Sequence, residues 1–82
     1  MPSLEILSGE ELVKFFVAQG FTVKSQRGSH IKLRRIVGGK KQTLVIPSHS
    51  PIKKGTLREI YAQAAVFVSD DILREYFYTK IK

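Results

Sequence analysis

Two histidines, His30 and His49, are the side chains of this 82-residue sequence best suited to transfer a proton near neutral pH. Cysteine is absent, which excludes disulfide bonds, thiolate metal ligands and a cysteine nucleophile. Both histidines lie within residues 12–58, a stretch without aspartate or glutamate, so neither has a neighbouring carboxylate for a metal site. No serine or threonine stands in a recognisable Ser–His–Asp pattern. The sequence therefore predicts acid–base chemistry by histidine, with no metal and no cofactor.

Positive charge is concentrated in the same stretch. The sequence has 14 lysines and arginines against 7 acids, a net charge of +7. The bases within residues 12–58 are Lys14, Lys24, Arg27, Lys32, Arg34, Arg35, Lys40, Lys41, Lys53, Lys54 and Arg58. A field of one sign attracts polyanions, which release counterions on binding. Anionic membranes fit less well, because they usually require a basic amphipathic helix or a lipid anchor. Nucleic acid is the expected partner.

His30 is the candidate catalytic residue. It follows the turn Arg27-Gly28-Ser29 and begins a predicted strand that also carries Lys32 and Arg34. RNA brings its own nucleophile, the 2′-hydroxyl, so a general base with cationic neighbours to stabilise the phosphate could suffice for cleavage. The alternative is that His30 is only a polar surface residue at the start of a strand.

Further candidates flank this histidine. His49, in the loop between Pro47 and Pro51, could act as an auxiliary acid or base, could contact phosphate, or could be only a structural or solvent-exposed loop residue. A helix start preceded by two lysines favours a phosphate, although solvated loop lysines are an equally ordinary interpretation. The expected RNA-binding residues are Lys24, Arg27, Ser29, Lys32, Arg34, Lys53, Lys54, Thr56 and Arg58.

Sequence patterns predict the elements that would position these residues. A capping box at Ser8 and Glu11 opens a helix over residues 9–19. Alternating apolar and polar residues predict strands over 21–26, 30–37 and 41–46, with a two-residue hairpin at 38–39. A loop over 48–55 precedes a second capping box at Thr56 and Glu59, and Ser69 with the acids after it begins a third helix.

This order predicts an α+β fold, a two-layer domain with a three-stranded antiparallel sheet and helices on one face. The helix-covered face is expected to carry Val23, Ile31, Leu33, Leu44 and Ile46, and the open face Thr22, Lys24, Gln26, His30, Lys32 and Arg34. We expect one domain over residues 1–82, with its core at about 8–67 and a C-terminal helical extension at about 69–80. The aromatic spacing of residues 15, 16, 21 and 67 predicts core positions. Residues 76–78 would either pack back or form a partner interface.

Four ordered motifs resemble the HicA (YcfA-like) toxin family. They are Gln19-Gly20-Phe21, Arg27-Gly28-Ser29-His30, Ile46-Pro47-Ser48-His49, and Gly55-Thr56-Leu57-Arg58-Glu59-Ile60 followed by Gln63-Ala64. Together they cover roughly residues 8–65. Family members commonly have glycine where this sequence has Ala65, which predicts that the second helix runs on.

The resemblance implies a double-stranded-RNA-binding-domain-like α-β-β-β-α fold. It also implies a translation-independent mRNA interferase, the toxin of a type II toxin–antitoxin pair whose site is masked by an acidic HicB-like antitoxin. On this resemblance His30 is the catalytic histidine. We expect a cytoplasmic protein, because residues 1–5 do not begin a signal peptide and no apolar run would span a membrane. An oligomer could form through the antitoxin or the last helix.

Two other functions remain open at this point. The same fold could serve as a non-catalytic RNA-binding module, in which case replacing His30 would change neither RNA affinity nor RNA integrity. The chain could instead be a protein-interaction subunit that uses its aromatic last helix. Removal of residues 69–82 would then abolish function, and RNA binding would be negligible.

Overall fold

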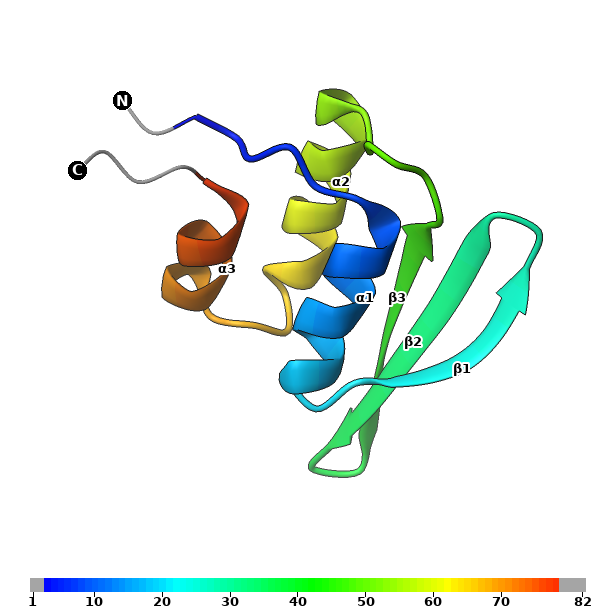
Figure 1. Ribbon diagram of the computed structural model, residues 1–82. Coiled ribbons are helices and arrows are strands. Elements are labelled where there is room, and N and C mark those ends of the chain that lie inside the picture. Colours follow the sequence, from blue (N-terminus) through cyan, green and yellow to red (C-terminus); the bar gives the residue numbers. More distant parts are fainter. Residues whose placement is uncertain (1–2, 79–82) are drawn as a thin grey trace.

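The computed structural model describes residues 3–78 and has an α+β architecture (Figure 1). In chain order the elements are α1 (Gly9–Ala18), β1 (Thr22–Arg27), β2 (His30–Val37), β3 (Lys40–Pro47), α2 (Lys54–Ala64) and α3 (Asp70–Phe77). This is the expected α-β-β-β-α order with an additional C-terminal helix. The last two residues of the predicted extension, 79 and 80, lie outside the described residues.

The strands form an antiparallel sheet in the order β1-β2-β3. Strands β2 and β3 pair without interruption from Val37 opposite Lys40 to His30 opposite Pro47. The predicted two-residue hairpin joins them, and its glycines have φ values of 56° and 79°. Positive φ at both positions belongs to the type I′ turn that matches the twist of a hairpin.

Strand β1 departs from the expected alternation because its register shifts between Val23 and Ser25. Lys24 is the extra residue, so Gln26 pairs with Ile31 and Arg27 pairs with His30. Directly paired residues share a face of the sheet. Gln26 therefore lies on the helix-covered side, which corrects its predicted place on the open face. Arg27, expected in the turn, instead ends the strand beside the catalytic candidate.

Helix α1 begins as predicted, with reciprocal hydrogen bonds between Ser8 and Glu11. Helix α2 does not, because it begins at Lys54 with Lys53 as its N-cap and has no side-chain cap. The Thr56 capping box is therefore wrong, and Thr56 lies inside the first turn. The prediction that this helix runs on past Ala65 is also wrong, since it ends at Ala64 in a turn toward α3.

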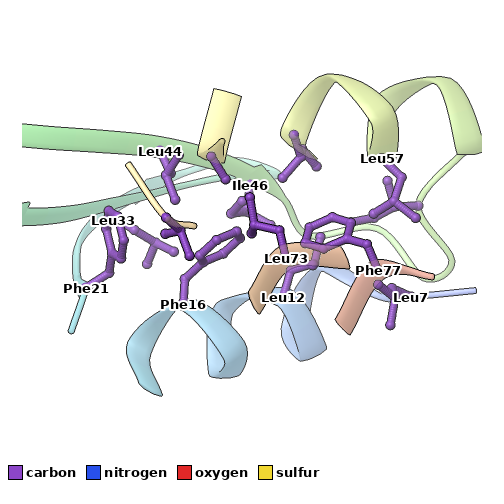
Figure 2. Packing of buried hydrophobic residues seen from close by; sticks show 14 residues of the cluster. Leu7, Leu12, Phe16, Phe21, Leu33, Leu44, Ile46, Leu57, Leu73 and Phe77 are labelled. Atoms are coloured by element: carbon purple, nitrogen blue, oxygen red, sulfur yellow. The ribbon is translucent and has the colours of Figure 1, made fainter. Parts of the chain in front are cut away.

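A single cluster of buried apolar side chains joins the sheet to all three helices (Figure 2). Leu33, Leu44 and Ile46 are fully buried on the covered face, as predicted. Val23 pairs with Leu33 and therefore lies on the same face, as predicted, but it is 49% exposed because β1 is an outer strand. Of the aromatic core candidates, Phe16 and Phe21 are buried, and residues 15 and 67 pack partly buried against the cluster.

Helix α3 packs back onto the domain, which answers the question left by its aromatic residues. Leu73 and Phe77 are buried in the common core, and the Tyr76 ring stacks on Phe15 with 4.1 Å between centroids. The backbone N–H of Glu5 donates to the Phe77 carbonyl at 2.7 Å, so the N-terminal segment lies against the end of this helix. Figure 1 shows α1 and α2 between the sheet and α3.

Candidate active site and nucleic-acid interface

His30 is exposed at the first position of the central strand β2. It pairs with Arg27 on one side and with Pro47 on the other, so it lies where all three strands meet the loops at that end of the sheet. We call the sheet face that carries His30, Lys32 and Arg34 the open face, since the helices lie on the opposite face (Figure 1). The predicted placement of His30 is confirmed.

The loop that carries His49 is held by backbone hydrogen bonds to the turn before His30 and to the start of α1. The Ser48 N–H donates to the Ser29 carbonyl at 2.6 Å, beside His30. The Gly9 N–H, at the start of α1, donates to the His49 carbonyl at 2.8 Å. The two histidines are thus placed relative to one another by main-chain contacts.

Gly9 permits this arrangement because α1 begins directly against the end of β3. A Cβ atom at this position would lie 2.0 Å from the Pro47 carbonyl oxygen and 2.9 Å from the Ser48 Cα. Real Cβ atoms do not approach backbone so closely, and therefore only glycine fits. Sequence reasoning assigned Gly9 to the helix start alone and missed its role in placing the loop.

His30 and His49 line the same open groove between the sheet and α2, which has a volume of about 290 Å³. Pro47 and Ile60 are its buried apolar members, and Val45 is a more exposed one. Its other lining residues are Thr56, Glu59 and Gln63, which are spaced three and four residues apart along α2. The groove therefore combines two imidazoles, a hydroxyl, a carboxylate and an amide above apolar side chains.

Gln63 also closes the edge of the sheet. Its Oε1 atom accepts a hydrogen bond of 3.2 Å from the backbone N–H of Val45 in the outer strand β3. This bond ties α2 alongside the strand and fixes which end of the amide faces away from it. Sequence reasoning did not select Gln63 or Glu59 as site residues. Glu59 follows Thr56 by three residues and Gln63 follows Glu59 by four. Positions with this spacing share a helix face, so the pattern could have indicated both residues.

Lys32 and Arg34 follow His30 along the open face, where register pairs them with Val45 and Thr43. Neither lines the groove itself, and among the described residues that do, none is a lysine or arginine. The Nε atom of Arg34 is buried and has no hydrogen-bond partner in the described part of the chain. Lys24 lies near Arg34, since both line a shallow depression beside Thr22.

Arg35, the next residue in this basic strand, faces the helices instead. Its guanidinium donates to Gln42 Oε1, to the Gln19 carbonyl and to the Phe67 carbonyl, each at 2.8 Å. It also lies 4.7 Å from the centre of the Phe21 ring. This arginine therefore joins the sheet to the ends of α1 and α2, whereas the neighbouring Arg34 lies on the open face.

The remaining predicted contacts lie around the groove. Lys53 and Lys54 are exposed at the start of α2, and Arg58 is exposed one turn farther along. Ser29 is half-buried in the turn before His30, and its carbonyl accepts the bond from the Ser48 N–H. The fold thus brings His30, His49 and Thr56 together in the groove, with the other expected RNA contacts on the surfaces beside it.

The ionisable groups with shifted pKa values lie away from this groove. Burial raises the pKa of Tyr61, and so does its hydrogen bond to Asp70, which also forms an ion pair of 3.3 Å with Arg74. Burial likewise raises the pKa of Tyr76, whose hydroxyl donates to the Glu11 carbonyl. These tyrosines contact α3 or belong to it, so their perturbation reflects helix packing.

Two properties of the described residues bear on metals and membranes. No three histidine, aspartate or glutamate side chains between residues 3 and 78 come together as a metal-ligand group. Within the same range, no helix is long and apolar enough to cross a membrane.

Comparison with known proteins assigns the chain to a protein family by its sequence. The family model described as "HicA toxin of bacterial toxin-antitoxin" matches residues 9–66, which extend from the first residue of α1 into the turn after α2. Neither the curated proteins nor the solved structures gave a match. The family match covers well over half of the chain and includes every element that lines the groove. The chain therefore belongs to the HicA family of toxins from bacterial toxin–antitoxin systems.

Proposed function

We propose that this protein is a metal-independent endoribonuclease that cleaves mRNA, with His30 as the general base. The observation that carries the proposal is the groove in which His30 and His49 both present exposed imidazoles. Membership of a toxin family and the basic open face beside the groove support it. An mRNA substrate would place the toxin in the cytoplasm.

The proposed reaction uses the RNA's own 2′-hydroxyl. His30 removes the proton from this hydroxyl, and the 2′-oxygen forms a bond to the adjacent phosphorus while the bond to the 5′-oxygen breaks. His49, as imidazolium, is the auxiliary residue that donates a proton to the departing 5′-oxygen. The products are a 2′,3′-cyclic phosphate and a 5′-hydroxyl, so that no external water or covalent enzyme intermediate is needed.

The cationic residues would bind the RNA on both sides of the cleaved bond. On one side, phosphates would bind to the basic residues of the open face, which are Lys24, Arg27, Lys32 and Arg34. Lys53, Lys54, Thr56 and Arg58 would hold a phosphate at the start of α2, where free backbone N–H groups already favour an anion. Ser29 would contact the strand at the turn between them.

We also propose a HicB-like antitoxin as the protein partner. Residues 12–58 contain no acid, and an acidic protein that covers the open face would both neutralise these bases and block the groove. Mixing the toxin with such an antitoxin should abolish RNA binding in low salt.

The test is incubation of the purified protein with a long single-stranded RNA and the matching DNA, both in EDTA. We expect cleavage of RNA only, and we expect the His30→Ala variant to leave the RNA intact. A His49→Ala variant should be slower than the wild-type protein. Intact RNA with tight, salt-sensitive binding by the wild-type protein would instead identify a non-catalytic RNA-binding module.

A further inference from the structure

Glu59 is the acid that stands out on this basic chain. It is exposed, it lines the groove with both histidines, and its carboxylate has neither a hydrogen bond nor an ion pair with any other described residue. The positions one helical turn away are glycine, threonine, alanine and glutamine at 55, 56, 62 and 63, so no basic residue of α2 neutralises it. A free carboxylate repels phosphate, so this part of the groove suits a ligand group that donates hydrogen bonds.

Gln63 supplies the complementary group one turn along the same face. Its Oε1 accepts from the Val45 backbone N–H at 3.2 Å, which leaves the Nε2 amino group as the free end. None of the described residues accepts a hydrogen bond from this amino group. The groove therefore presents a fixed hydrogen-bond donor and a carboxylate acceptor side by side. Their Cβ atoms are about 5–6 Å apart, as for any i, i+4 pair on a helix.

The apolar side chains that line the same groove provide a surface for a flat ring. Pro47 and Ile60 are buried there, and Val45 is 38% exposed. A volume of about 290 Å³ in an open groove accommodates one nucleobase against this surface. Single-stranded RNA is read by splaying out such a base and bonding its Watson–Crick edge.

We propose that Glu59 and Gln63 select a guanine next to the phosphate cleaved at His30, an inference that rests on the proposed ribonuclease function. The guanine edge carries one acceptor, O6, followed by two donors, N1–H and the N2 amino group. Gln63 Nε2 donates to O6, and the two Glu59 oxygens accept from N1–H and from the N2 amino group.

The other bases match this pattern less well. Uracil offers O4 to Gln63 and N3–H to Glu59, but its O2 faces the second carboxylate oxygen. Adenine and cytosine place an amino group against the Gln63 amino group and a lone pair against the carboxylate. The expected order of preference is guanine, then uracil, with adenine and cytosine last. The discrimination arises because a mismatched base covers these polar groups and leaves them unpaired.

The experiment uses the full-length His30→Ala protein, which binds without cleaving, and RNA hexamers of adenosine in which only the third nucleotide is varied. We expect guanosine to bind about 5- to 160-fold more tightly than adenosine, the range of a good two-bond base contact. Inosine, which lacks the N2 amino group, should fall between them. Cleavage of a mixed RNA by the wild-type protein should occur next to guanosine.

Two variants separate base reading from fold. Glu59→Gln should reduce the preference for guanosine to less than about threefold, whereas Asp71→Asn, which changes the net charge equally on the exposed start of α3, should preserve it. Gln63→Glu keeps an acceptor for the Val45 N–H and so keeps the melting temperature, but it should lose the preference because O6 then faces a carboxylate.

Several results would overturn the inference. Equal binding of all hexamers, or wild-type cleavage without a guanosine preference, removes the base-reading role while the ribonuclease function stands. A Glu59→Gln variant that cleaves all sequences equally slowly, with a displaced pH–rate profile, would make this carboxylate a partner of a histidine instead. Absence of both RNA binding and RNA cleavage would refute the proposed function together with the inference.

Discussion

At the scale of single residues, the arrangement of the groove depends on Gly9. This glycine is buried where α1 meets the end of β3, and its N–H holds the carbonyl of His49 at 2.8 Å. Its φ value is not unusual, so the requirement comes from the space around it and not from backbone conformation. Because Ser48, the residue before His49, donates its N–H to the carbonyl of the residue before His30, displacement of this loop moves both imidazoles.

Gly9→Ala should therefore lower both stability and activity. The added methyl group would overlap the Pro47 carbonyl oxygen at 2.0 Å, and overpacking of this kind costs about 1–3 kcal/mol of unfolding free energy. Chemical denaturation measures the stability loss, and RNA cleavage assayed where the variant is still folded measures the activity. Gly55→Ala, in open space on α2, is the matched control and should preserve stability. An unchanged Gly9→Ala protein would refute the close approach.

At the scale of elements, α3 is joined to α2 by a polar contact as well as by the core. Tyr61 on α2 donates a hydrogen bond to Asp70 at the start of α3, and Asp70 pairs with Arg74 one turn later. The Tyr61 ring also meets the Phe77 ring edge to face, with 5.2 Å between centroids. Ionisation of the Tyr61 phenol would remove the donated proton and place two negative charges together.

The connection between α2 and α3 should therefore weaken at high pH. Because the folded state raises the pKa of Tyr61, the folded protein holds this proton more tightly than the unfolded chain does. The corresponding stability is present below the ordinary tyrosine pKa of about 10 and is lost as pH rises above it. Denaturant midpoints measured from pH 8 to 11 should fall more steeply for the wild-type protein than for Tyr61→Phe. Parallel profiles would contradict this assignment.

The sequence predicts the elements well where local chemistry decides them. The capping box at Ser8, the hairpin glycines and the alternation in β2 each determine backbone geometry by themselves. It fails where a tertiary contact decides. No local pattern indicates the register shift at Lys24, so the sequence predicts an uninterrupted strand there. Likewise, no local pattern indicates that α2 begins at Lys54 and not after Thr56.

The candidate site also has one part that the sequence predicts and one that depends on tertiary contacts. The motif around His30 and the base-rich strand can be read from the sequence, and the histidine lies on the open face as predicted. The groove cannot be predicted from the sequence, because Glu59 and Gln63 line it only when α2 lies along the edge of β3. Arg35 shows the converse, since its charge suggests RNA binding and its side chain joins the helices to the sheet.

At the scale of the whole molecule, basic residues on the two faces of the sheet have different roles. The described part of the structure places Lys32 and Arg34 on the open face, whereas Arg35 and the buried core lie on the other side of the same strand. Polyanion binding to such a surface is driven by counterion release, so its affinity falls with salt in proportion to the phosphates contacted. Alternate residues of one strand thus serve binding and stability.

Arg34→Gln and Arg35→Gln should separate these two roles. Arg34→Gln should weaken RNA binding and reduce the slope of log affinity against log salt concentration by about 0.7, the value for one phosphate of a single strand. Arg35→Gln should instead lower the unfolding free energy by about 2–3 kcal/mol, because bonds to two backbone carbonyls lose their donor. Equal salt slopes for the wild type and Arg34→Gln would contradict the placement of RNA on the open face.

The central claim is that His30 activates the 2′-hydroxyl of the RNA, and the chemistry of the cut ends tests it most directly. Cleavage products formed in EDTA by the wild-type protein can be identified by mass spectrometry within the first turnovers. The account predicts a 2′,3′-cyclic phosphate on one fragment and a 5′-hydroxyl on the other, and no products from His30→Ala. Products with a 3′-hydroxyl and a 5′-phosphate would contradict it, because they require attack by water and not by the neighbouring hydroxyl.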